Sequence, residues 1–331
     1  MSADRTPQRT ALVTGANGFL GSEVVRRLVD EGWTVLALHL PEADLTALEG
    51  VETTRIACDV LDGPGIADLL PQRLDAVVHC ASSTSLWRRM GPEQLRTNVR
   101  GTRGIARLAQ ARGARMVHIS CAAAYGQHSG VIAPGTPRIG RNSPVTFVRS
   151  KAMAEIEIER GLRSGLDAVV LNPGFMMGAR DRKGWSRLVR LVAQRRLPGV
   201  PPGGASFCSA RAVATAAIRA IGHASRGARY LIGGVNVSYA GLAREIGTQL
   251  GHRRFLRPVR PAVLNAYARM EEAMAPLLGR EPDVTREAVT LLSGNTYCDG
   301  RAAQSAFQLE TVPLETMVAD CIEWMRASGQ L

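Results

Sequence analysis

The chain has 331 residues, 45% of them hydrophobic, and a formal net charge of +12. This length and composition exclude a disordered or fibrous protein and allow two lobes or one large domain. No apolar run reaches the roughly 18 to 20 residues of a membrane helix, and residues 1–10 are too polar for a secretory signal, so we expect a cytoplasmic protein without a membrane partner.

The charged residues and cysteines narrow the class of protein further. The basic residues are spread along the chain rather than gathered in runs, which argues against nucleic acid as a partner, although the field would attract an anionic ligand. The six cysteines form no CxxC pair and show no zinc-type spacing, so we expect no metal site.

Apolar runs typical of buried strands alternate with segments of helical spacing in the first half of the chain. We expect helices at Phe19 to Glu31 and Pro92 to Arg112. The expected strands are Thr10 to Thr14, Thr34 to His39, Thr53 to Cys58, Asp75 to His79, Arg115 to Ser120 and Ala168 to Leu171. This alternation predicts an α/β fold with a Rossmann-type, doubly wound parallel sheet.

The pattern changes after Leu171, where glycine and proline become frequent around a short helix near Trp185 to Arg196. The rest of the chain is expected to be mostly helical, with one strand at Arg229 to Ile232. We therefore expect a smaller, mostly helical C-terminal substrate lobe over the carboxyl ends of the strands. The predicted division is 1–171 and 206–235 for the dinucleotide-binding lobe, and 172–205 and 236–331 for the substrate lobe.

Three glycines follow the first expected strand: Gly15, Gly18 and Gly21. Their GxxGxxG spacing permits a tight turn, a close approach of backbone to a pyrophosphate, and close packing of the following helix. The context of strand, turn and helix is the one in which such glycines bind a dinucleotide rather than form an ordinary turn. The sequence therefore predicts a nicotinamide-type cofactor.

The choice between NAD and NADP depends on the residues after the second strand. There the chain has His39-Leu40-Pro41-Glu42, without an acid or an arginine at the strand end. Glu42 could reach a ribose, which would favour NAD, whereas the net positive charge of the protein slightly favours NADP. The choice between the two cofactors therefore stays open. Asp59, after the third strand, is placed either to accept a hydrogen bond from the adenine amino group or to cap the next turn.

Several motifs together resemble one branch of the extended short-chain dehydrogenases. Besides Thr14 to Gly21, they are Cys58-Asp59-Val60, Asp75 to Ser82, Asn98 to Thr102, Ser150-Lys151, Asn172-Pro173, Gly178 to Asp181, Gly233 to Asn236 and Asp320 to Gly329. The chain is similar to the dihydroflavonol-reductase-like and hopanoid-associated sugar epimerase-like members of the NAD-dependent epimerase/dehydratase family. The resemblance spans almost the whole chain, and it makes a homodimer plausible.

The resemblance also assigns site residues. It implies cofactor contacts at Gly15, Asn17, Gly18, Phe19, Leu20, Gly21, Asp59, Val60, Cys80, Ala81, Ser82, Lys151 and Pro173. In this family a lysine binds the nicotinamide ribose and lowers the pKa of a tyrosine four residues earlier, while a serine or threonine holds the substrate oxygen. Lys151 and Asn98 stand at the family's catalytic positions, but the tyrosine position is Phe147 and the serine position is Cys121.

The missing phenol leaves three candidates for a proton donor. Cys121 would serve as acid or nucleophile if Lys151 lowered the pKa of its thiol, against the alternative that it only fills the serine site. Tyr125 carries a phenol near the expected pocket, although an aromatic residue there can also be structural. A water molecule held by Lys151 or Asn98 is the third candidate. Lys151 is one of only two lysines, with Lys183, among 41 basic residues, which suggests that a compact ammonium group is needed there.

The expected substrate side of the site is mostly apolar. Its candidates are Trp87, Phe147, Phe175, Met176 and Met177, with Arg180 for an anionic group. The leading hypothesis is an NAD(P)-dependent oxidoreductase that acts on a carbonyl or secondary hydroxyl of an apolar small molecule with an atypical proton donor. The alternatives are a non-redox isomerase, cyclase or dehydratase on the same fold, and an NAD(P)-binding regulatory protein without turnover.

Overall fold

The computed structural model describes residues 8–252 and 256–331. Its centre is a parallel sheet of seven strands in the order β3-β2-β1-β4-β5-β6-β9. These strands are β1 (Thr10–Thr14), β2 (Thr34–His39), β3 (Thr54–Ala57), β4 (Ala76–His79), β5 (Arg115–Ile119), β6 (Ala168–Pro173) and β9 (Arg229–Ile232). The predicted doubly wound Rossmann-type sheet is confirmed, and the expected strand ends differ from the observed ones by at most two residues.

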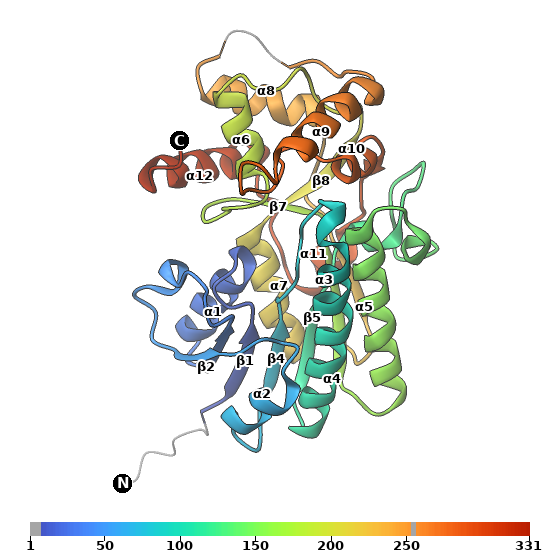
Figure 1. The fold of residues 1–331 in the computed structure, drawn as a ribbon. Coiled ribbons are helices and arrows are strands. Elements are labelled where there is room, and N and C mark those ends of the chain that lie inside the picture. The colour runs from blue at the N-terminus through green and yellow to red at the C-terminus, as the bar shows by residue number, and fades with distance from the viewer. Residues whose placement is uncertain (1–7, 253–255) are drawn as a thin grey trace.

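Helices cover both faces of this sheet because successive residues of each strand point to opposite sides. On one face, Val13 of β1 packs with α1 (Phe19–Asp30) and α7 (Ala210–His223). On the other face, Leu12 packs with α2 (Gly63–Leu69), α4 (Thr102–Ala111) and α5 (Thr146–Arg163). Figure 1 shows the large sheet in the lower half of the molecule and a second group of elements above its upper edge.

That second group contains the cap helices. They are α6 (Ser186–Ala193), α8 (Tyr239–Gln249), α9 (Pro261–Met274), α10 (Arg286–Leu292) and α12 (Leu314–Ala327). Helix α11 (Arg301–Ala306) instead returns to β9, and its neighbour Phe307 is buried in the core beside α7. The smaller lobe therefore lies over the carboxyl ends of the strands, as expected (Figure 1).

A small second sheet was missed by the sequence interpretation. β8 (Gly204–Ser209) pairs with β7 (Phe175–Met177), β10 (Val235–Ser238) and β11 (Asn295–Thr296). We expected loops or helices at these positions because β7 and β11 are very short and β8 begins with glycine and contains serine and cysteine. The sheet joins segments far apart in the chain and forms part of the base of the cap.

The connection between β4 and α4 is an irregular helix. A short helix, α3 (Gly91–Leu95), runs into a π-helical turn, η3 (Arg96–Gly101), and then into α4. A π-helical turn inside a helix shifts the direction of its side chains and is frequent at functional sites. Here the turn carries Asn98. No helix in the part of the chain that the structure describes is long and apolar enough to cross a membrane.

Candidate nicotinamide-dinucleotide site

The glycine loop between β1 and α1 has the close approach that a pyrophosphate site needs. Gly15 has a φ of +63°, and a Cβ atom there would lie 2.8 Å from the backbone of Ala81. A Cβ atom on Gly21 would collide with the carbonyl oxygen of Gly15. Both positions therefore require glycine.

The first turn of α1 faces this loop and is free of competing groups. Its N-cap residue, Gly18, makes no side-chain cap, and the first turn contains no acidic residue. The N-terminal N–H groups and the positive end of the helix dipole therefore remain suited to an anion such as a pyrophosphate. Phe19, Leu20 and Gly21 form this turn. The residues present fit a dinucleotide.

The neighbouring strand ends are joined by side-chain hydrogen bonds. The Thr14 hydroxyl lies 2.7 Å from His79 Nδ1 and accepts from the Ala81 N–H at 3.2 Å. His79 Nε2 lies 3.0 Å from the Thr102 hydroxyl. Burial lowers the pKa of His79 to about 3, so its imidazole is neutral. These contacts hold the segment Cys80-Ala81-Ser82 beside the glycine loop, where the sequence predicts cofactor contacts.

Lys151 lies inside the protein, one turn into α5 from Phe147. Its Nζ donates to the carbonyl oxygen of Ile119 at 2.7 Å and to Ser82 Oγ at 3.4 Å. Desolvation by burial lowers the pKa of this ammonium group. An ammonium group has three N–H donors, and these contacts use two, so one remains for a ribose hydroxyl or a water molecule.

Asn98 uses its whole side-chain amide within the protein. Its Oδ1 accepts from the Ser83 N–H at 2.8 Å and the Ser82 hydroxyl at 3.1 Å, while its Nδ2 donates to the Ser83 carbonyl at 2.9 Å and to Ser150 Oγ at 2.8 Å. Both donors and the acceptor oxygen are thus engaged. Asn98 therefore connects the Ser82–Ser83 loop to α5. Because its amide is fully engaged, this arrangement argues against Asn98 as the residue that holds a proton-donating water molecule.

Phe147 and Cys121 lie together in an apolar environment. They contribute to what we call the Phe147 cluster: Leu86, Cys121, Ala123, Val145, Phe147, Val148, Phe175, Leu291 and Leu292. Burial outweighs the nearby Lys151 and raises the pKa of the Cys121 thiol to about 11. Lys151 does act to lower this pKa, but its effect is smaller than that of burial, so the thiol is not activated. At neutral pH the group is a thiol, which donates a weak hydrogen bond, rather than a nucleophilic thiolate.

Tyr125 points away from this cluster. It is 1% exposed and packs with Ala122, Ile132, Leu231 and Cys298, and burial raises the pKa of its phenol. The short helical turn at Ala122–Tyr125 directs the ring into the core, so this position argues against Tyr125 as the proton donor. His128 also serves a local role, with Nε2 at 3.1 Å from the Tyr125 carbonyl oxygen.

The substrate candidates separate into two groups. Phe147 and Phe175 belong to the Phe147 cluster, and Phe175 also contacts Trp185 with ring centroids 5.1 Å apart. Trp87 is half-buried on the loop before α3. Met177 is instead fully buried in the core of the cap, and Met176 packs against the core beside α1 and α7. Met177 is therefore enclosed, and the substrate contact of the partly buried Met176 stays a prediction.

Arg180 and Arg182 link the loop after β7 to the dinucleotide side of the molecule. Arg180, which we expected to meet an anionic group on the substrate side, forms an ion pair of 3.3 Å with Glu23 of α1. Arg182 pairs with the Asp44 carboxylate and donates to Thr46 Oγ1 in the loop after β2. Asn17 Nδ2 donates to the Asp44 carbonyl at 3.2 Å, which joins the same loop to the glycine turn. Sequence reasoning missed Asp44 and Arg182.

The remaining predicted cofactor residues lie at the carboxyl edge of the sheet. Asp59 Oδ1 accepts from the Leu61 N–H at 3.0 Å, so one carboxylate oxygen caps the turn after β3. Val60 is buried against Gly101, where a Cβ atom would come within 2.8 Å of a Val60 methyl group. Pro173 ends β6. Their contacts with a cofactor stay predictions.

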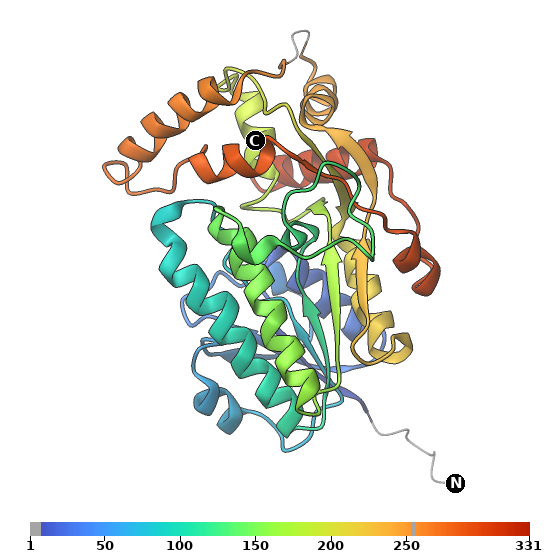
Figure 2. The ribbon, with the colours of Figure 1, turned by 90° about the vertical axis from the view of Figure 1, so that its right-hand side faces the viewer.

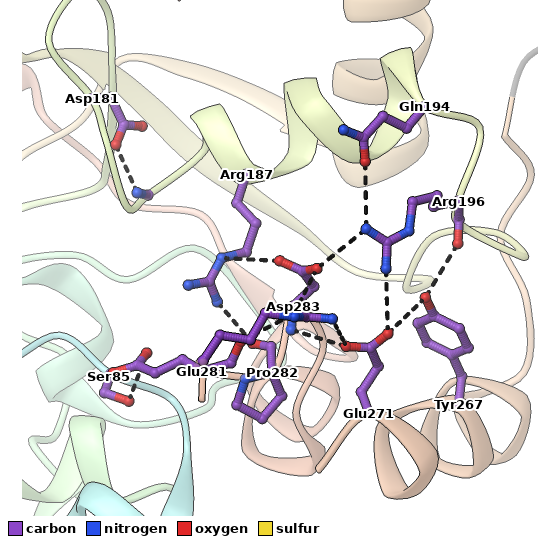
Figure 3. Close-up of polar contacts among 12 residues, drawn as sticks. Ser85, Asp181, Arg187, Gln194, Arg196, Tyr267, Glu271, Glu281, Pro282 and Asp283 are labelled. Atoms are coloured by element: carbon purple, nitrogen blue, oxygen red, sulfur yellow. Dashed lines mark hydrogen bonds and ion pairs between the residues drawn. The ribbon is translucent and has the colours of Figure 1, made fainter. Parts of the chain in front are cut away.

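Polar contacts hold the cap together above the Phe147 cluster. Glu271 of α9 accepts from the Tyr267 hydroxyl at 3.3 Å and lies 3.7 Å from Arg196 (Figure 3). Glu271 also accepts from Arg280 at 3.2 Å. Asp283 joins the same network through Arg187 and Arg196 (Figure 3). Asp283 also pairs with Arg280. The network connects the α6 segment to α9.

The cap also binds the large lobe directly. Ser85 Oγ donates to Glu281 at 3.4 Å (Figure 3), and the Thr285 hydroxyl donates to the Leu86 carbonyl oxygen at 2.6 Å. Glu287 accepts from the N–H and hydroxyl of Thr146, at the first turn of α5. These contacts fix α10 over the Phe147 cluster.

The sheet, glycine loop and buried lysine together define a dinucleotide-binding protein of the extended short-chain dehydrogenase class. The chain matches the family described as "NAD dependent epimerase/dehydratase family" over residues 11–233, and it belongs to that family. The expected resemblance is confirmed, and the family's cofactor is a nicotinamide dinucleotide.

Three known proteins are similar to it. "Sterol demethylase protein B" of Methylococcus capsulatus is 28% identical over 97% of this chain and 100% of that protein. "2-alkyl-3-oxoalkanoate reductase" of Stenotrophomonas maltophilia is 28% identical over 58% of each chain. The crystal structure of gox2253 superposes with a TM-score of 0.84 at 26% identity, over 98% of this chain and 100% of that one.

Proposed function

We propose that this protein is an NAD(P)-dependent oxidoreductase that acts on the carbonyl or secondary hydroxyl group of an apolar small molecule. The observation that carries the proposal is the Phe147 cluster, which lies beside the buried Lys151 and is almost entirely apolar. Apolar walls bind apolar ligand surface, and a few polar groups set its orientation. The names of two relatives, a sterol demethylase protein and an alkyl-oxoalkanoate reductase, agree with an apolar substrate.

The cofactor would be held by the glycine loop, the first turn of α1 and Lys151. When bound, it supplies or accepts the hydride. We propose NADP as the preferred form because β2 ends in His39 without an acid, and because Arg182 reaches the loop that follows this strand. Lys151 would orient the ribose through its remaining N–H donor.

The substrate oxygen needs a proton from a group other than a tyrosine. With Tyr125 buried and Asn98 saturated, two donors remain: the Cys121 thiol and a water molecule held by Lys151 Nζ. The thiol is a weak acid, with a pKa of about 11. Removal of a positioned acid typically costs about 10² to 10⁴ in rate, so we expect slow turnover by the wild-type protein.

The experiment is a reductase assay on a panel of apolar ketones with wild type, Phe147→Tyr and Cys121→Ala. We expect measurable wild-type activity that Phe147→Tyr raises by about 10² or more, because the phenol would stand one turn before Lys151. A Cys121→Ala protein as active as wild type would leave the water molecule as the donor. No activity in any variant, despite cofactor binding, would contradict the proposal.

A non-redox isomerase, cyclase or dehydratase on the same fold is the second candidate function. The replacement of the phenol by Phe147 favours it, because such an enzyme needs no proton exchange coupled to hydride transfer. A protein that converts its substrate at the same rate with oxidised or reduced cofactor, and without change in the cofactor's absorbance, would belong to this class.

A further inference from the structure

The side of α9 that is exposed is apolar. Figure 2 shows this helix, in orange at the upper left, along the outside of the cap. Five large apolar side chains of α9 and of the turn after it are exposed: Leu277 at 87%, and Val263, Met270, Met274 and Leu278 at 48% to 54%. We call these five residues the outer α9 face. Contiguous exposed apolar patches mark surfaces that bind a partner.

The spacing of the residues explains why they share one side of the helix. At about 3.6 residues per turn, Val263, Met270 and Met274 fall within roughly one third of the circumference. The other residues of this third are exposed alanines: Ala262, Ala266 and Ala273. Since the opposite side buries Leu264 and Ala268 in the cap, α9 is apolar on two sides. A globular helix usually presents polar residues to water, so the outer side suits an apolar partner.

The charged residues of α9 give this surface a positive sign. Both acids of the helix, Glu271 and Glu272, already pair with arginines of the cap. Arg260 begins the helix, and Arg269 directly precedes Met270; both arginines are exposed. In the part of the chain that the structure describes, neither forms an ion pair or a side-chain hydrogen bond. The outer side of α9 therefore combines apolar side chains with uncompensated positive charge.

We propose that the outer α9 face binds the surface of a bilayer that contains anionic phospholipids. The helix lies in the plane of the interface, with its apolar side chains among the acyl chains and its two arginines at the phosphate groups. A second copy of this chain offers no free carboxylate on the same face, so it would bury both arginines unpaired. The expectation of no membrane partner was based on the absence of a spanning segment, and this contact needs none.

The position of α9 relates the bilayer to the candidate site. Helix α9 packs on α10, whose Leu291 belongs to the Phe147 cluster. A bilayer on the outer α9 face therefore lies on the cap side of this cluster. Uptake of an apolar substrate from the bilayer would follow, and this consequence rests on the proposed function. Binding of the bilayer itself does not, so it is tested without substrate or cofactor.

The test is flotation of the full chain with vesicles at about 150 mM salt, where long-range attraction between charges is screened. One set of vesicles is a mixture of phosphatidylcholine and phosphatidylglycerol, and the other is phosphatidylcholine alone. We expect saturable binding of wild type to the anionic vesicles. Met270→Gln/Leu277→Gln should weaken it at least about tenfold, because it places two amides among the acyl chains. Arg260→Gln/Arg269→Gln should weaken it about tenfold through the loss of two charges.

The matched control is Leu69→Gln/Val131→Gln, which makes the same kind of change at two residues outside the cap that are 57% and 52% exposed. It is expected to bind the anionic vesicles as wild type does. The proposal is overturned if wild type floats with neither set of vesicles, if it binds both sets equally, or if the control weakens binding as much as Met270→Gln/Leu277→Gln. It is also overturned if wild type without vesicles is a dimer that Met270→Gln/Leu277→Gln dissociates.

Discussion

Asn98 Nδ2 donates to Ser150 Oγ at 2.8 Å and thereby joins the π-helical turn to the helix that carries Lys151. The Ser150 hydroxyl in turn donates to the Phe147 carbonyl oxygen at 2.8 Å. A residue at a family catalytic position is therefore part of the scaffold that fixes Phe147 and Lys151 relative to the Ser82 loop. We therefore expect replacement of Asn98 to reduce the stability of the protein first, rather than to act directly on the reaction.

We predict that Asn98→Ala lowers the free energy of unfolding by about 2 to 4 kcal/mol, because it leaves several buried polar groups of the Ser82–Ser83 loop and Ser150 without partners. Urea unfolding measures this loss. The control is Asn142→Ala, at an exposed position, which should change the unfolding free energy by less than about 0.5 kcal/mol. An Asn98→Ala protein as stable as wild type would show that this connection is unimportant.

The Cys121 thiol is predicted to react slowly with iodoacetamide at pH 8. With a pKa of about 11, only about one thiol in a thousand is ionised there, and the rate should rise about tenfold per pH unit up to pH 10. Peptide mass spectrometry follows this residue separately. Rapid alkylation of Cys121 at pH 7.5 would mean that Lys151 does activate the thiol.

The raised pKa of Cys121 also makes the stability of the folded protein depend on pH. The folded protein keeps the Cys121 proton to higher pH than the unfolded chain does, so this group's contribution to stability is present at neutral pH. It is lost as the pH rises from about 9, near the pKa of an unperturbed thiol, towards 11. In Cys121→Ala, unfolding measured over this range should show a smaller decrease in stability than in wild type.

Arg182→Gln is predicted to weaken the binding of NADPH by about tenfold and that of NADH much less. The guanidinium group contacts the loop after β2, where a 2′-phosphate would lie, and hydrogen bonds between charged groups are strong. Its partner, Asp44, has a pKa lowered to about 2 by hydrogen bonds from the N–H and hydroxyl of Thr46 and from Arg182. Fluorescence titration measures both affinities.

The neighbouring Lys183→Gln serves as the control for Arg182→Gln, since it removes one positive charge from the same loop. It should leave the ratio of the two affinities unchanged. If Arg182→Gln weakens NADH and NADPH equally, the arginine only supports the loop and the preference for NADP must come from elsewhere.

Glu271→Gln is predicted to loosen the cap without disturbing the large sheet. The carboxylate is buried between Arg280, Arg196 and Tyr267, so its neutralisation leaves charged partners uncompensated and should destabilise the cap by about 1 to 3 kcal/mol. Hydrogen exchange should accelerate in Pro261–Met274 and stay unchanged in β1. The exposed Glu310→Gln should alter neither, and an unchanged cap in Glu271→Gln would contradict the role of the network.

Most of the large sheet could be predicted from the sequence because its central strands, such as β1, β4 and β6, are buried on both faces and are mostly continuous apolar runs. Strand β8 could not be predicted, because its sequence contains glycine, serine and cysteine. It therefore shows neither a continuous apolar run nor a clear alternation of apolar and polar residues. The positions of Lys151 and Phe147 on one helix follow from their spacing. The direction of Tyr125 does not, because it depends on the tertiary position of a single short turn after β5.

The most direct measurement is a titration of wild type and Lys151→Met with NADPH and NADH, followed by nicotinamide fluorescence. We predict saturable binding to wild type below about 1 mM and binding at least about tenfold weaker to Lys151→Met, since the substitution removes the ammonium group proposed to bind the ribose but keeps the length of the side chain. Failure of wild type to bind either cofactor at millimolar concentration would contradict it.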